Sequence, residues 1–142
     1  MTLELLKSYR SKKDEIKELT YKLEHLGEGD SLVGNDVIFD YRSGFPVPKS
    51  VVGVDRNKYY SLKNRWGSRR EQLINDCEQV EEFVENIPDS ITRRIFRKCF
   101  IEGETQEHVS IDLHIAQSNI SRKINNYLKS HKKHKKACYN QN

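Results

Sequence analysis

Long apolar runs are missing from this chain of 142 residues. Its uninterrupted apolar stretches are only a few residues long, whereas a helix that spans a membrane needs about 20 such residues. The N-terminal sequence M-T-L-E-L-L-K also lacks the apolar centre of a signal peptide. We therefore expect a cytoplasmic protein that has no membrane partner.

Cysteine is scarce as well, and the three cysteines have no paired spacing. This pattern argues against a disulfide framework and against a zinc site built on Cys pairs, and it is typical of a reducing compartment. His131, His134 and Cys138 are close in sequence, but a structural zinc site takes four ligands and these three stand in a run of lysines. We expect no metal and no other cofactor.

The sequence motifs of common enzymes are also absent. There is no G-x-x-x-x-G-K-[ST] phosphate loop, no H-E-x-x-H and no G-x-S-x-G. Asp36, Asp40 and Asp55 are spread along one segment and form no recognisable acid–base pair. Because an active site needs convergent groups, we expect that the protein is not an enzyme.

What the chain does contain is amphipathic sequence. With 35% hydrophobic and 32% charged residues it has too little apolar material for one large core, so elongated helices are favoured. The first 26 residues carry a heptad-like seam, interrupted by Lys12: Leu5, Tyr9, Ile16, Leu19, Leu23 and Leu26. A second seam runs from about Asn57 to Asn86: Tyr59, Leu62, Trp66, Leu73, Val80, Phe83 and Ile87. Such helices must bury their seams, either in an antiparallel hairpin, in a homodimer through this N-terminal arm, or in both.

The segment 27–56 between the two seams reads as a long loop. It holds five of the seven glycines and two of the three prolines, with short extended pieces expected at 37–39 and 51–52. Its aromatic and basic residues have two interpretations: a second contact with DNA or a protein, or no contact role, in which case they pack on the apolar seams or stay mobile. These residues are Phe39, Tyr41, Arg42, Phe45 and Lys49.

The most informative segment is Thr105 to Leu128, whose pattern predicts a helix-turn-helix. Six apolar residues recur at the spacing of two short packed helices: Val109, Leu113, Ile115, Ile120, Ile124 and Leu128. Thr105 is placed to cap the first helix. Polar residues face outward on the second helix, where a recognition helix reads DNA: Gln117, Ser118, Ser121, Arg122 and Asn125. The alternative is an ordinary helical hairpin with a solvated face.

From Ile87 onward the chain resembles region 4 of sigma-70-type factors, and it is similar to small phage and prophage regulators that use this module. The matching features are a helix start at Pro88, an apolar stripe of Ile91, Ile95 and Cys99, an exit at 100–103, T-Q-E at 105–107 and I-S-R at 120–122. The resemblance implies a three-helix unit that binds duplex DNA, with RNA polymerase as a further partner. His114 stands where the turn of the family usually has Gly, which implies a strained positive φ.

The net positive charge of the chain is concentrated near the C-terminus. Residues 1–103 contain 18 basic and 18 acidic residues, whereas residues 104–142 contain 7 basic and 3 acidic. We expect phosphate contacts from the lysines on and after the second helix: Lys123, Lys129, Lys132 and Lys133. The alternative for the run that ends at Lys136 is a disordered solubilising tail.

These observations predict a mainly α protein. Its expected parts are a coiled-coil-like arm (1–86) with the loop 27–56, a three-helix domain (87–129) and a basic tail (130–142). The expected function is that of a sequence-specific transcriptional regulator encoded by a phage or prophage, which reads duplex DNA with the 117–128 helix. The alternative is an oligomeric phage assembly protein, similar to the small DNA-recognition subunit of a terminase.

Overall fold

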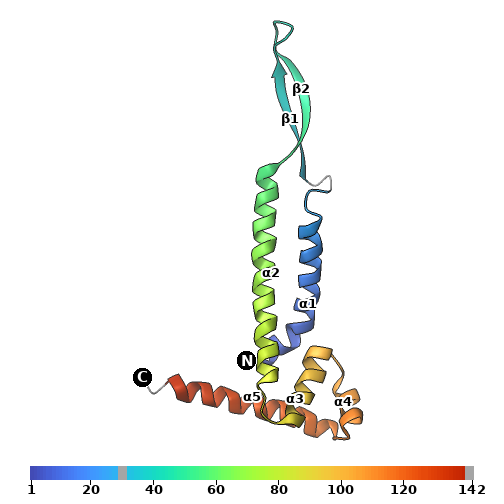
Figure 1. Ribbon diagram of the computed structural model, residues 1–142, viewed down its shortest axis with the longest axis vertical. Helices are drawn as coiled ribbons and strands as arrows, with labels where there is room; N and C mark the ends of the chain where they lie inside the picture. The colour runs from blue at the N-terminus through green and yellow to red at the C-terminus, as the bar shows by residue number, and fades with distance from the viewer. Residues whose placement is uncertain (29–31, 140–142) are drawn as a thin grey trace. The chain divides into compact units, whose positions relative to one another are not determined.

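The computed structural model describes residues 1–28 and 32–139, except for the side chains of 33–38, 50–52 and 132–139. The chain is mainly α-helical, as predicted. In order, its elements are α1 (Leu3–Glu24), β1 (Val33–Asp40), β2 (Val47–Val54), α2 (Arg56–Glu85), α3 (Ser90–Phe96), a π-helical segment η2 (Arg97–Glu102), α4 (Gln106–Leu113) and α5 (Gln117–Tyr139) (Figure 1). Among the described helices, none combines the length and the apolar character that crossing a bilayer requires.

Two compact units make up the chain, and α1 and α2 each contribute residues to both units. The first unit contains residues 1–15 and 72–142, and the second contains residues 16–71. The sequence suggested a division near residue 86, at the end of the second seam. The first unit extends further back because the C-terminal half of α2 carries part of its core, namely Leu73, Cys77, Val80 and Val84.

The core of the first unit joins the base of the arm to the C-terminal helices. Residues 73, 77, 80, 84 and 87 follow the alternating spacing of four and three that keeps one helix face apolar, and all five are buried. From α1, Leu6 is fully buried whereas Leu5 is only half-buried, so Leu6 takes the place expected for Leu5, while Tyr9 and Leu19 of the expected seam are buried. Burying one side chain of this kind contributes about 1.5–3 kcal/mol to the free energy of folding. This buried apolar face is therefore the main stabilising feature of the first unit.

Polar contacts also fasten α1 to α2 within the first unit. The Tyr9 hydroxyl donates to Glu81 Oε1 at 2.5 Å, and Lys13 Nζ lies 2.8 Å from the same carboxylate. Lys12, the polar residue in the expected seam, pairs with Asp76 at 2.5 Å. Burial and the bond to Glu81 raise the pKa of Tyr9 to about 12. Because Tyr9 contacts Glu81 and Cys77 of α2, this part of the seam has a partner in its own chain.

The second unit contains an antiparallel β-hairpin where the sequence suggested a loop. β1 pairs with β2 from Val33 opposite Val54 to Asp40 opposite Val47, and Gly44 closes the turn at φ 76°. The expectation of a long loop at 27–56 was therefore wrong for residues 33–40 and 47–54, whereas the short extended pieces expected at 37–39 and 51–52 are confirmed, since they lie within β1 and β2. Glycines and Pro48 weakened the strand pattern, but Pro is tolerated in a two-stranded sheet because both strands are edges. Phe39, Tyr41 and Phe45 are exposed, so they do not cover the helical seams.

Candidate nucleic-acid interface

The C-terminal group of helices, α3 to α5, begins at a side-chain N-cap. The side chain of Asp89 accepts a hydrogen bond from the Thr92 backbone N–H at 3.0 Å, and α3 starts at Ser90. Pro88 therefore precedes the cap and is not the helix start that the resemblance implied. The bond from the Thr92 hydroxyl to Asp89, together with the cap, holds the pKa of Asp89 below its usual value.

The apolar stripe of α3 differs from the expected one. Ile91 is 46% exposed and Cys99 is half-buried, whereas Thr92, Ile95 and Phe96 are buried. The cause is local: the Asp89 cap draws Thr92 inward, and the π-helical turn of η2 changes the residue spacing after Phe96. Burial raises the pKa of the Cys99 thiol to about 11, so this cysteine is a packing residue and not a thiolate at neutral pH.

The exit from η2 depends on Gly103, which adopts a left-handed conformation at φ 76°. A Cβ atom at this position would lie 2.0 Å from Arg10 Nη1, because the guanidinium of Arg10 packs over the glycine. The same nitrogen lies 3.5 Å from the Gly103 carbonyl oxygen. Glycine is favoured here by its backbone conformation, and a larger residue would also have to displace the exposed Arg10 side chain.

Two capping motifs set the length of α4. Thr105 accepts a hydrogen bond from the His108 backbone N–H at 3.2 Å, which confirms the predicted N-cap. At the other end His114 adopts φ 53° and ψ 39°, as its place in the turn implied. The His114 and Ile115 amides bond back to the carbonyls of Ile111 and Ser110, which is the Schellman pattern that usually has Gly at this position.

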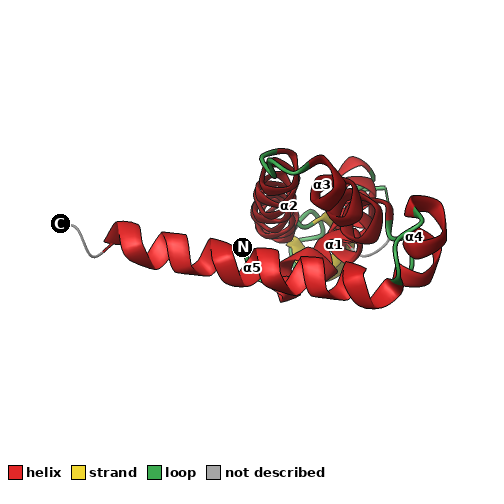
Figure 2. Ribbon diagram, turned by 90° about the horizontal axis from the view of Figure 1, so that it is seen from below, coloured by secondary structure: helices red, strands yellow, loops and turns green. Residues whose placement is uncertain are grey.

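The predicted core of the two helices is largely present. Val109, Ile120, Ile124 and Leu128 are buried, whereas Leu113 and Ile115 are half-buried. α4 and α5 contact each other, and α3 contacts α5. The arrangement is that of a short helix, a tight turn and a longer helix lying across its neighbours (Figure 2).

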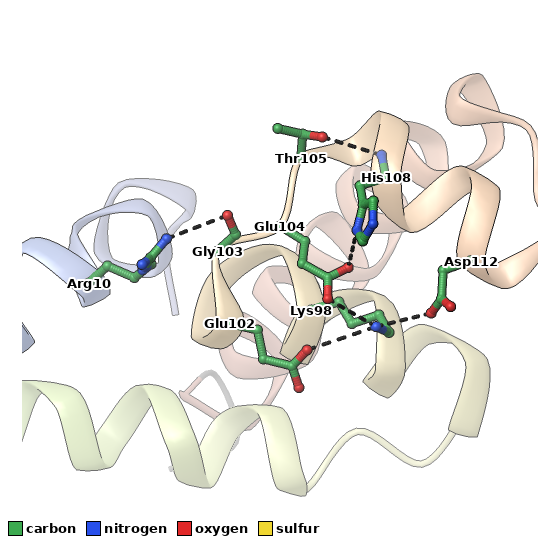
Figure 3. A network of polar contacts seen from close by, with 8 residues as sticks. All are labelled: Arg10, Lys98, Glu102, Gly103, Glu104, Thr105, His108 and Asp112. Carbon is green, nitrogen blue, oxygen red and sulfur yellow. Dashed lines mark hydrogen bonds and ion pairs between the residues drawn. The ribbon is translucent and has the colours of Figure 1, made fainter.

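A charged network fixes α4 against the preceding segment (Figure 3). Lys98 Nζ lies 3.0 Å from Asp112 Oδ2 and 3.1 Å from Glu104 Oε1. Glu104 also lies 3.0 Å from His108 Nδ1. These contacts lower the pKa of Asp112 and Glu104, for Asp112 chiefly through Lys98 and for Glu104 chiefly through His108, and they raise the pKa of Lys98. The network holds the α4 end of the turn without any contribution from α5.

α5 is anchored on one face between Ile120 and His131. In the later part of this stretch the helix packs on α2, where the Phe83 ring lies 5.9 Å from Tyr127 and 5.0 Å from His131 between ring centroids. Phe96 of α3 also contacts Tyr127, with centroids 5.6 Å apart. Because Ile120, Ile124, Leu128 and His131 hold one face over about three turns, the opposite face is presented in a fixed orientation.

Most of the predicted site residues share that opposite face. Ser118, Arg122, Asn125 and Lys129 are exposed and spaced by four, three and four residues, which places them on one stripe about 16 Å long. Gln117 is exposed at the helix start. Ser121 and Lys123 are half-buried, and Lys123 lies near enough to Asp89 to contribute to lowering its pKa.

Sequence reasoning missed two members of this face. Asn119 and Asn126 are exposed on α5 beside the stripe, and a helical wheel centred on Arg122 includes both. Asparagine amides are among the groups that recognise base edges. The outer face therefore carries amides, a hydroxyl and two cations, and no carboxylate.

The second helix is longer than predicted. The backbone of α5 continues to Tyr139, so the segment expected as a tail from residue 130 starts within the helix. Lys132 and Lys133 lie outside the described side chains, as do His134 and Cys138, and their predicted roles stay predictions. No protein-family model, curated protein or solved structure matches this chain.

Proposed function

We propose that this protein is a sequence-specific DNA-binding regulator of transcription that reads duplex DNA with the outer face of α5. The observation that carries the proposal is the exposed stripe Ser118, Arg122, Asn125 and Lys129 on a helix whose opposite face is anchored. A major groove about 12 Å wide admits one such helix, and these residue types hydrogen-bond base edges and phosphates.

The geometry around the stripe supports the proposal. α4 is capped at both ends and precedes α5 by a tight turn, which is how a helix-turn-helix positions its recognition helix. The outer face of α5 from Gln117 to Ser130 contains no acidic residue that would repel phosphate. An ordinary helical hairpin needs neither the strained turn at His114 nor a charge bias on one face.

By resemblance, we propose RNA polymerase as a second partner. We further propose that this protein regulates a polymerase that already carries a sigma factor. A complete sigma factor needs a further domain that captures unpaired bases through aromatic and basic side chains. Here the only tryptophan, Trp66, is half-buried in the second unit. We expect no promoter-specific run-off transcript from core enzyme and this protein alone.

The test of the proposed function is selection of duplexes from a random pool by the full chain, followed by titration. We expect enrichment of one sequence and tighter binding to it than to a scrambled duplex of the same composition. Binding that does not distinguish the two duplexes would contradict sequence-specific recognition.

A further inference from the structure

The charges of α2 are segregated into two halves. Residues 56–70 contain six basic residues and no acidic one: Arg56, Lys58, Lys63, Arg65, Arg69 and Arg70. Residues 71–85 contain six acidic residues and no basic one: Glu71, Asp76, Glu78, Glu81, Glu82 and Glu85. In the first turn this order opposes the helix dipole, which favours negative charge at the N-terminus, so helix stability does not explain it.

The acidic half has counter-charges within the first unit. Asp76 pairs with Lys12, Glu81 with Lys13, and Glu85 with Arg97. The basic half is different: among the described residues, no carboxylate pairs with Arg56, Lys63, Arg65 or Arg70. Four of the six cations in the basic half therefore lack a carboxylate partner within the described part of the chain.

Three of these cations form a row. Arg56, Lys63 and Arg70 are seven residues apart, so they lie on nearly the same side of the helix at intervals of about 10 Å. The row is about 21 Å long, comparable to about six base pairs of duplex at 3.4 Å each. A row of this length matches the extent of a phosphate backbone and exceeds that of a single small anion.

A groove in the second unit includes two members of the row, Lys63 and Arg70. It has a volume of about 430 Å³ and is lined by Leu23, Lys63, Asn64, Gly67, Ser68 and Arg70. Gly67 contributes no side chain to the lining of the groove, and the space where its Cβ would lie is open, with no atom within 4 Å. The wall groups are donors, namely an ammonium, an amide, a hydroxyl and a guanidinium.

Arg70 adds an independent observation. Its Nε atom is buried and has no hydrogen-bond partner among the described residues. A buried donor without a partner is unfavourable, so this guanidinium is suited to an acceptor from outside the chain. Because Arg70 lines the groove, a phosphate oxygen bound there would be an acceptor for it.

From these observations we infer that the basic half of α2 is a second, sequence-independent DNA contact, in which Lys63 and Arg70 hold the phosphate backbone. The inference rests on the proposed function and deepens it, because α5 would provide sequence specificity whereas α2 would provide additional affinity for any duplex. Backbone contacts position a protein on duplex DNA and make its binding dependent on salt.

The test compares the full chain with the double variant Lys63→Gln/Arg70→Gln on the selected duplex and on its scrambled form. We expect the slope of log K against log salt to decrease in magnitude by nearly 2, about 0.9 for each phosphate contact. Affinity at 0.1 M salt should fall about tenfold or more for both duplexes, with their ratio preserved.

The matched control is Lys7→Gln/Lys22→Gln, which removes the same two charges from exposed sites on α1 that do not line the groove. We expect this control to keep the parent slope. An unchanged slope in the Lys63/Arg70 variant, or an equal change in the control, would overturn the inference while leaving the α5 proposal intact. Failure of the parent chain to bind any duplex would overturn both.

Discussion

Lys98 Nζ lies 3.0 Å from the carboxylate of Asp112, and this contact joins η2 to the last turn of α4. Glu104 shares the same ammonium and extends the network to His108. The turn before α5 is consequently held by charge on one side and by Val109 in the core on the other. This dual support matters for recognition, since the orientation of α5 depends on where α4 ends.

The first prediction concerns the stability of the protein at acidic pH. Glu104 and Asp112 have pKa values below their usual 4.5 and 3.8, so both carboxylates bind fewer protons in the folded than in the unfolded state. Their stabilising effect is present above pH 4.5 and is lost as pH falls through the lower folded values. Thermal unfolding of the parent chain should therefore occur at lower temperature below pH 4.5.

Lys98→Gln supplies the control for that prediction. Without the ammonium, Asp112 loses the main cause of its lowered pKa, so this variant should show a weaker pH dependence between pH 3 and 5. Parallel curves for parent and variant would show that the network does not contribute to stability.

A second prediction concerns the strained turn. His114 is the one non-glycine residue with positive φ among the described residues, a conformation that costs about 1–2 kcal/mol outside glycine. Glycine relieves this strain but adds about 0.4–1 kcal/mol of unfolded-state entropy. We expect His114→Gly to raise the free energy of unfolding by up to about 1 kcal/mol, measured by denaturant titration. His114→Ala keeps the strain and should bring no gain; equal stabilisation by both variants would contradict this explanation.

Gly67 provides a third prediction. It lies in the interior of α2, where glycine costs about 0.5–1 kcal/mol relative to alanine, and an added Cβ would meet no atom within 4 Å. Gly67→Ala should therefore raise the free energy of unfolding by about that amount. Gly103→Ala should act in the opposite direction, because of its φ of 76° and the overlying Arg10. Stabilisation by both changes would contradict the distinction drawn between the two glycines.

Local chemistry made the C-terminal helices largely predictable. The Thr105 cap, the left-handed His114 and the buried Ile120, Ile124 and Leu128 all follow from rules that act within one or two turns. The outer face of α5 followed as well, because it is the complement of the apolar stripe. Asn119 and Asn126 were within reach of the same reasoning and were missed only by drawing the face too narrowly.

Other features depend on contacts that are distant in sequence. The β-hairpin forms by pairing Gly34 with Gly53 and Phe39 with Pro48, residue types that indicate a loop when each segment is considered alone. The choice of Leu6 over Leu5 depends on how α1 packs against α2. The exposure of Ile91 depends on the Asp89 cap and the π-helical turn, neither of which changes the apolar pattern of the sequence.

The central claim is that α5 reads DNA sequence, and Arg122→Ala tests it most directly. Arg122 is exposed in the middle of the stripe, and loss of a base contact costs about 1–3 kcal/mol, or about 5-fold to 150-fold in affinity. Titration should show this loss for the selected duplex and a much smaller change for the scrambled one, whereas Lys7→Ala on α1 should preserve the ratio of the two affinities. If Arg122→Ala also preserves that ratio, α5 does not recognise DNA in the proposed way.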